Sequence, residues 1–224
     1  MKNKKKSLKK KNPSKTKAII FDIGGVLQLE KKQKSFIPLI KKNKGIHQSV
    51  AFKLNVGIDQ YLDSIDTAYA KSITGQIKRK QLLYLMSRRF NQNPEKILEI
   101  YHETFKKNFI LNKELLDKAK QLKKQRYKIA IISDMWPFAK DVLVIKEFYK
   151  TFDFVLLSCD TGLRKPQKEI YYLALKKLDI KPAQAVFIDN QKWNTQAAEK
   201  LGIKTILFKK NKQTIGELNK ILEN

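Results

Sequence analysis

Residues 17–27 read KAIIFDIGGVL, in which four consecutive apolar residues end in a carboxylate and a Gly-Gly pair follows. A short, uninterrupted apolar run of this kind is typical of a strand buried on both faces of a parallel sheet. The aspartate, Asp22, then stands at the carboxyl end of the strand, where open α/β sheets bind their ligands. The glycines, Gly24 and Gly25, favour a tight turn whose backbone N–H groups suit an anion.

Four further apolar runs follow the same pattern later in the chain. They are Lys128–Ser133, Phe152–Leu157, Gln184–Asp189 and Lys204–Phe208. Amphipathic helical patterns alternate with these runs, at Lys113–Gln125, Lys168–Leu178 and Thr195–Leu201. Regular alternation of strand and helix predicts an α/β fold, a Rossmann-like parallel sheet with helices on both faces.

The interval between the first two strands has a different character, because it contains no convincing strand. Its amphipathic patterns predict helices at Ile58–Lys71, Gly75–Phe90 and Pro94–Phe109. We therefore expect an α/β core built from residues 17–30 and 113–224, and a helical cap formed by residues 31–112. Residues 1–16 are expected to be a solvated, disordered basic tail.

The charge of the chain is extreme, with 48 Lys and Arg against 21 Asp and Glu among 224 residues, a net of +27. Only five of the basic residues are arginines. Sites that recognise phosphates or bases specifically favour arginine, because its planar guanidinium group can donate two hydrogen bonds at once. The pattern therefore indicates diffuse lysine enrichment, and we expect at most weak, non-specific binding of polyanions through the lysine-rich tail. A tail that binds RNA or anionic lipid specifically is the alternative.

Other features of composition limit the class of protein. The single cysteine, Cys159, rules out a disulfide framework and suits a reducing, cytoplasmic location. No window approaches 18 uncharged apolar residues, so no transmembrane helix is expected. The basic start lacks the apolar core and small-residue cleavage site of a signal peptide, because Asp22 interrupts the apolar run.

Polar residues at the carboxyl ends of separate strands predict a single site. Asp22, Ser133 and Asp189 each end one apolar run, and parallel strands bring these ends to one edge of the sheet. Two carboxylates there would repel each other, and a divalent cation would relieve the repulsion. Mg²⁺ suits such a place, since it takes few carboxylates and keeps waters and phosphate oxygens. Lys165 adds a cation on a loop closed by Pro166, which opens the following helix.

Four motifs, in order and in their expected structural contexts, carry a resemblance to a known family. They are Ile20–Leu27, Ile131–Asp134, Gly162–Pro166, and Val186–Asn190 with Asn194, Ala197, Ala198 and Leu201-Gly202. Together they resemble the haloacid dehalogenase (HAD) superfamily, in the branch with a helical cap after the first strand. The resemblance covers nearly everything from Lys17 to Phe208 and implies the same Rossmann-like core with an inserted cap.

The resemblance also implies roles for individual residues. Asp22 would be the nucleophile that forms an aspartyl-phosphate, Ser133 would hydrogen-bond a phosphoryl oxygen, and Lys165 would neutralise charge. Mg²⁺ would be held by Asp22, the backbone carbonyl of Gly24 and Asp189, with Asn190 as a further candidate. The substrate would contact Gly24, Gly25, Ser133, Asp134 and Lys165.

One position departs from the phosphatase pattern of the family. The second acid of its first motif is Gly24 here, which has no proton to give to a leaving oxygen. General acid–base help contributes about 10²–10⁴-fold, so its loss would weaken catalysis without abolishing it. Many relatives also have a second Asp where this chain has Asn190, which lowers the charge around a metal.

We therefore expect a magnesium-dependent hydrolase, weakened at Gly24, that acts on a small phosphorylated metabolite. Two alternatives stay open: a dehalogenase-type carbon–halogen hydrolase, which shares the Asp nucleophile and needs no magnesium, and a catalytically weak HAD fold that binds RNA or another polyanion. His47 and His102 lie outside every motif and are interpreted as ordinary cap residues. Trp136 and Trp193 follow the second and fourth motifs and are expected at the mouth of the site.

Overall fold

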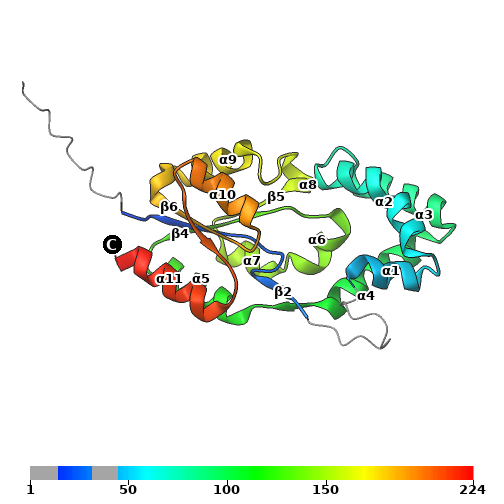
Figure 1. The fold of residues 1–224 in the computed structure, drawn as a ribbon, viewed down its shortest axis with the longest axis horizontal. Helices are drawn as coiled ribbons and strands as arrows, with labels where there is room; N and C mark the ends of the chain where they lie inside the picture. The colour runs from blue at the N-terminus through cyan, green and yellow to red at the C-terminus, as the bar shows by residue number, and fades with distance from the viewer. Residues whose placement is uncertain (1–14, 32–44, 224) are drawn as a thin grey trace, which may run out of the picture.

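The structure is a computed structural model that describes residues 15–31 and 45–223. Its centre is a five-stranded parallel sheet in the order β5-β4-β1-β6-β7. The first strand, β1 (Ala18–Phe21), lies in the middle, where Ala18 pairs with Lys128 of β4 and Ala185 of β6. This Rossmann-like α/β core confirms the fold class expected from the alternation of strands and helices (Figure 1).

The remaining elements complete the core. The other strands of the sheet are β4 (Lys128–Ser133), β5 (Phe154–Leu157), β6 (Ala185–Asp189) and β7 (Lys204–Leu207). The core helices are α5 (Lys113–Lys124), α6 (Pro137–Leu143), α7 (Lys146–Thr151), α8 (Ser158–Thr161), α9 (Lys168–Leu178), α10 (Lys192–Lys200) and α11 (Asn211–Glu223), with a short 3-10 turn, η1 (Pro182–Gln184).

Side chains that alternate along the strands build a hydrophobic core on each face of the sheet. Ile19 and Phe21 point to the face covered by α5, α7 and α11, whereas Ala18 and Ile20 point to the face covered by α9 and α10 (Figure 1). All four side chains are fully buried. Burial on both faces explains why these strands are apolar throughout instead of alternating with polar residues.

Four helices form an insertion between the first two strands of the sheet. They are α1 (Ile46–Lys53), α2 (Ile58–Ile73), α3 (Arg79–Phe90) and α4 (Pro94–Asn108). Figure 1 shows this helical insertion gathered at one end of the core, beyond α6. Helix α4 begins as its sequence predicts, because Pro94 occupies the first turn and the Asn93 side chain accepts a hydrogen bond from the Glu95 amide at 2.7 Å.

A two-stranded antiparallel ribbon joins the helical insertion to the core. It pairs β2 (Gln28–Glu30) with β3 (Phe109–Leu111), and Gln28 lies opposite Leu111. The expectation that residues 30–112 hold no strand is therefore wrong at its C-terminal end. Each strand has three residues, too few for a readable alternation, and their pairing depends on a contact between distant parts of the chain.

Several helix boundaries also differ from the sequence prediction. The helix expected at Gly75–Phe90 begins at Arg79, because Gly75 has φ +68° and lies in the turn after α2. The sequence patterns predict none of the helices α1, α6, α7, α8 and α11. The tail expected at residues 1–16 lies almost wholly outside the described residues, as do the lysines between residues 32 and 44. Among the helices of the described ranges, none has the length and apolarity needed to cross a membrane.

Candidate active site

The sheet brings the predicted polar residues together at its carboxyl edge. Asp22 follows β1, Ser133 ends the neighbouring β4, and Asp189 ends β6 on the other side of β1. Lys165 comes from the loop between α8 and α9. All four are buried, with exposed fractions of 6%, 1%, 0% and 3% in that order. Charged side chains buried this deeply need partners, and the site supplies them internally.

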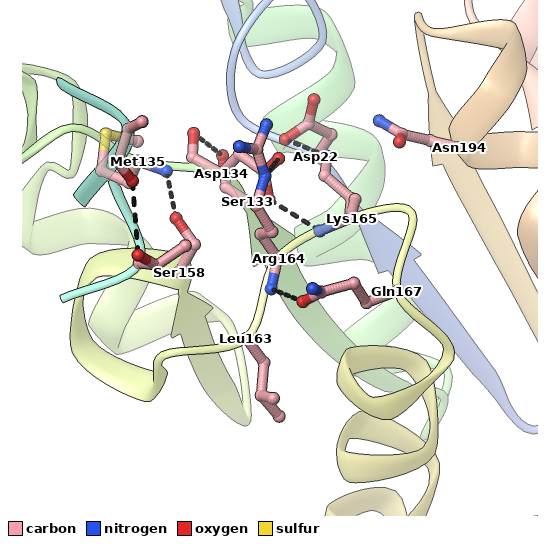
Figure 2. A network of polar contacts seen from close by, with 12 residues as sticks. Asp22, Ser133, Asp134, Met135, Ser158, Leu163, Arg164, Lys165, Gln167 and Asn194 are labelled. Carbon is pink, nitrogen blue, oxygen red and sulfur yellow. Dashed lines mark hydrogen bonds and ion pairs between the residues drawn. The ribbon is translucent and has the colours of Figure 1, made fainter. Parts of the chain in front are cut away.

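Lys165 is the cation that links the two carboxylates. Its Nζ lies 2.9 Å from Asp22 Oδ1 and 2.6 Å from Asp189 Oδ2, and Figure 2 shows the side chain reaching from its loop toward Asp22. Burial alone would lower the pKa of Lys165, but Asp22 and Asp189 together raise it to about 12. The ammonium group therefore stays charged throughout the physiological range.

Asp22 is held in a position that suits a nucleophile. Its Oδ1 accepts hydrogen bonds from the Ile23 amide at 2.7 Å and from Lys165. Burial raises the pKa of Asp22 to about 6, although Lys165 and a hydrogen bond from Ser133 act in the opposite direction. At neutral pH Asp22 is thus mostly ionised, as an attacking carboxylate must be.

Asp189 is committed to positioning the lysine. Besides Lys165, it accepts hydrogen bonds from the Gln191 amide at 2.7 Å and from Asn194 Nδ2 at 3.1 and 3.2 Å. Asn194 is fixed in turn, because Tyr171 Oη donates to its backbone oxygen at 3.0 Å. Both carboxylate oxygens of Asp189 are therefore occupied before any ligand arrives.

Asp134 anchors the loop that carries the lysine. Its Oδ1 accepts a hydrogen bond from the Lys165 amide at 2.9 Å, and its Oδ2 lies 3.6 Å from Arg164 Nε. Figure 2 shows Asp134 next to Ser133 and to these two residues of the loop. Burial raises the pKa of Asp134, whereas Lys165 and Arg164 oppose that rise. Asp134 thus lies beside the site with contacts that position Lys165, and its contact with the substrate stays a prediction.

The two glycines after Asp22 have different surroundings. Gly25 has φ +76°, and a Cβ there would come within 2.2 Å of Asn190 Nδ2, so the turn packs directly on that amide. Its two chain neighbours aside, a Cβ on Gly24 would meet no atom of the described residues within 4 Å. Gly24 instead lines a cavity of about 180 Å³ between the core and the helical insertion.

Oxygen atoms of the kind that bind Mg²⁺ lie around the turn after Asp22. Asn190 Oδ1 is buried, and no other described residue hydrogen-bonds to it. The Gly24 carbonyl likewise accepts no hydrogen bond from the described part of the chain. With the Asp22 carboxylate they form a set of hard oxygen donors of the kind Mg²⁺ takes, alongside waters and phosphate oxygens. These residues fit Mg²⁺. Because the set contains one carboxylate, and a neutral amide in place of a second carboxylate, it should bind the ion less strongly than a set with two carboxylates.

The cavity is lined by a histidine that was expected to be an ordinary residue of the cap. His47, from the first turn of α1, lines it together with Tyr69 of α2, Trp136, and Asp134. No sequence motif marks His47, because only the packing of the insertion against the core places it there.

Of the two tryptophans expected at the mouth of the site, Trp136 lines the cavity and Trp193 does not. Trp136 is buried, and its Nε1 donates a hydrogen bond to Ser72 Oγ of the insertion at 2.8 Å. Trp193 is 60% exposed.

Comparison with known proteins identifies the family of the chain. The family model described as "Haloacid dehalogenase-like hydrolase" matches residues 19–208, and the chain belongs to that family. It is 27% identical over 222 residues to bifunctional epoxide hydrolase 2 of Sus scrofa, an alignment that covers 92% of this chain and 38% of the relative. The chain thus spans less than half the length of the curated relatives it matches first.

Solved structures share the fold. A predicted HAD-like family hydrolase from Porphyromonas gingivalis superposes with a TM-score of 0.71 at 19% identity, over 93% of this chain and 98% of that one. A HAD family enzyme from Bacteroides thetaiotaomicron, in complex with magnesium and inorganic phosphate, gives 0.68 at 18% identity, over 87% and 94%. The HAD superfamily assignment made from the four motifs is confirmed.

Proposed function

We propose that this HAD-like hydrolase is a magnesium-dependent phosphatase that acts on a small phosphorylated metabolite through Asp22. The observation that carries the proposal is the position of Lys165 Nζ between Asp22 and Asp189, with Ser133 beside Asp22. A fixed cation and a hydroxyl next to a buried carboxylate suit an incoming phosphoryl group. The magnesium and phosphate bound by the structurally similar Bacteroides enzyme support the same chemistry.

The reaction would proceed in two displacements. Asp22 attacks phosphorus, the bond from phosphorus to the leaving oxygen breaks, and an aspartyl-phosphate forms. Water then attacks that phosphorus, the bond to Asp22 breaks, and orthophosphate leaves. Lys165 and Ser133 stabilise the charge on the phosphoryl oxygens in both steps. Mg²⁺, held by Asp22, the Gly24 carbonyl and Asn190, would supply further charge neutralisation.

The first test is hydrolysis of 4-nitrophenyl phosphate with and without millimolar magnesium. The wild type is expected to show magnesium-dependent turnover, and Asp22→Asn is expected to reduce it to background. A phosphorylated protein should be detectable by mass spectrometry in the wild type and absent in Asp22→Asn. Release of halide from a 2-haloacid without magnesium, and no phosphate release, would favour the dehalogenase alternative.

The second test separates two candidate metal ligands at the carboxyl end of β6, Asp189 and the next residue, Asn190. Because a ligand that binds only the folded state stabilises it, magnesium should raise the Tm of the wild type. Asn190→Asp adds a carboxylate to the donor set and should enlarge this rise, measured by scanning fluorimetry at several magnesium concentrations. If Asn190→Asp leaves the rise unchanged and Asp189→Asn abolishes it, then Asp189 holds the ion.

The weak polyanion binding expected of the tail stays a prediction, since residues 1–14 lie outside the described ranges.

A further inference from the structure

The site lacks a proton donor at the position where its chemistry needs one. A leaving alkoxide must gain a proton, and the water that attacks the aspartyl-phosphate must lose one. Gly24 has no side chain to do either, and it lines the cavity at a point where no described residue beyond its chain neighbours comes within 4 Å of where a Cβ would lie. Any group that replaces a carboxylate at residue 24 must therefore enter this cavity from another element.

The lining of the cavity offers few candidates. Most of its residues are apolar, and among the described residues that line it only His47, Tyr69 and Asp134 titrate. Asp134 is committed to the Lys165 amide and faces Arg164, so its carboxylate already anchors the loop. Burial raises the pKa of Tyr69, so its hydroxyl stays protonated at neutral pH and is too weak an acid to exchange its proton readily. His47 is the candidate that is not otherwise engaged in the site.

The ring of His47 is held in place from one side. Its Nδ1 lies 3.3 Å from Tyr61 Oη, which is paired at 2.7 Å with Tyr101 Oη. The ring also packs against Tyr61, with centroids 5.7 Å apart, and edge-on against Tyr69 at 5.9 Å. Nε2 has no hydrogen-bond partner within the described ranges. A histidine fixed through Nδ1 can transfer a proton through Nε2.

We propose that His47 is the acid–base catalyst that compensates for Gly24, a role that rests on the proposed phosphatase function. In the first step, the bond from phosphorus to the leaving oxygen breaks and that oxygen takes the proton from His47 Nε2, leaving a neutral imidazole. In the second step, the neutral Nε2 takes a proton from the attacking water as orthophosphate leaves Asp22. The imidazolium is restored, so the protons balance over one turnover.

The cavity that contains His47 also limits the size and polarity of the substrate's leaving group. The cavity holds about 180 Å³, and Trp136, Phe105 and Phe109 contribute aromatic walls. A leaving group seated there is small, uncharged and largely apolar, such as a short-chain or aromatic alcohol.

The test compares phosphate esters whose leaving groups differ in pKa, with kcat/KM reporting the first step. His47→Ala should reduce kcat/KM for an alkyl phosphate by about 10²–10⁴-fold and leave the value for 4-nitrophenyl phosphate much less changed, because a good leaving group needs no proton. With 4-nitrophenyl phosphate the variant should also show a burst, since hydrolysis of the aspartyl-phosphate loses its base.

Two further variants sharpen the result. Gly24→Asp in the His47→Ala background should restore turnover of alkyl phosphates, because the space over Gly24 accepts a side chain. His102→Ala is the matched control, because His102 lies in the same insertion but does not line the cavity. Its Nε2 lies 3.3 Å from Asp141 Oδ2 instead. The His102→Ala variant should leave the dependence on leaving group as in the wild type.

Other outcomes overturn the inference in distinguishable ways. If His47→Ala slows alkyl and aryl esters equally, or not at all, while Asp22→Asn abolishes both, the phosphatase function stands and His47 is not the acid. If Asp134→Asn, and not His47→Ala, steepens the dependence on leaving group, Asp134 has the role. If no ester is turned over in an Asp22-dependent manner, the proposed function itself fails, and the role of His47 with it.

Discussion

Lys165→Met is expected to abolish turnover and to destabilise the folded protein by about 3–5 kcal/mol at pH 8. The substitution keeps most of the side-chain volume and removes the cation between two buried carboxylates, which lie 2.9 and 2.6 Å from its Nζ. Like charges would then face each other in a site that solvent barely reaches. Urea unfolding in magnesium-free buffer measures the loss.

The loss of stability should depend on pH in a defined direction. In the wild type, burial already raises the pKa of Asp22 to about 6, against the lowering effect of Lys165. Without the lysine, the folded-state pKa of Asp22 rises further above its unfolded value. A group with such a raised pKa stabilises the protein below the unfolded pKa, and this stabilisation is lost as pH rises through the folded pKa. The deficit of Lys165→Met should therefore be smaller at pH 5 than at pH 8.

A matched control distinguishes this effect from the general loss of a lysine. Lys123 forms a partly exposed ion pair with Asp153 at 2.6 Å. Lys123→Met is expected to cost about 0–1 kcal/mol, because exposed pairs contribute little. Equal destabilisation of Lys165→Met at pH 5 and pH 8 would contradict the account of two buried carboxylates held together by one cation.

The parts of the fold that were predicted from the sequence are those with a local signal. The apolar runs at 17–22, 128–133 and 184–189 are buried on both faces, so their composition alone predicts parallel strands and the residues at their ends. The ribbon of β2 and β3 has no such signal, since three residues on each side form strands only through pairing with each other.

The site divides in the same way. Asp22, Ser133, Lys165 and Asp189 lie in motifs with fixed spacing along the chain, and the structure brings them within one buried cluster. His47 belongs to no motif, and its place depends on how α1 packs against Tyr61, Tyr69 and the core. The hydrogen bonds of Asp189, and the lack of one to Asn190 Oδ1 among the described residues, were equally unpredictable, because they depend on how the surrounding amides pack in space.

Gly25→Ala should impair the site and the fold together, although it adds a single methyl group. Gly25 has φ +76°, a left-handed conformation that costs a residue with a Cβ about 1–3 kcal/mol. The new Cβ would also lie 2.2 Å from Asn190 Nδ2, so either the turn or the amide must move. A shift of about 1 Å in a catalytic site can cost about 10²-fold in rate. We expect a lower Tm, a weakened magnesium response and strongly reduced phosphatase activity.

The neighbouring glycine provides the control for this prediction. Gly24 lies outside the left-handed region, and in the described part of the chain a Cβ there meets no atom within 4 Å apart from its chain neighbours. Gly24→Ala should therefore change the free energy of unfolding by no more than about 0.5 kcal/mol, as substitutions away from packed or strained positions usually do. Urea unfolding and the magnesium-dependent Tm of the two variants, measured side by side, test the difference. If both variants lose the same free energy of unfolding and the same magnesium response, then the turn after Asp22 tolerates side chains equally at residues 24 and 25. The close approach of Gly25 would then not hold Asn190 in place.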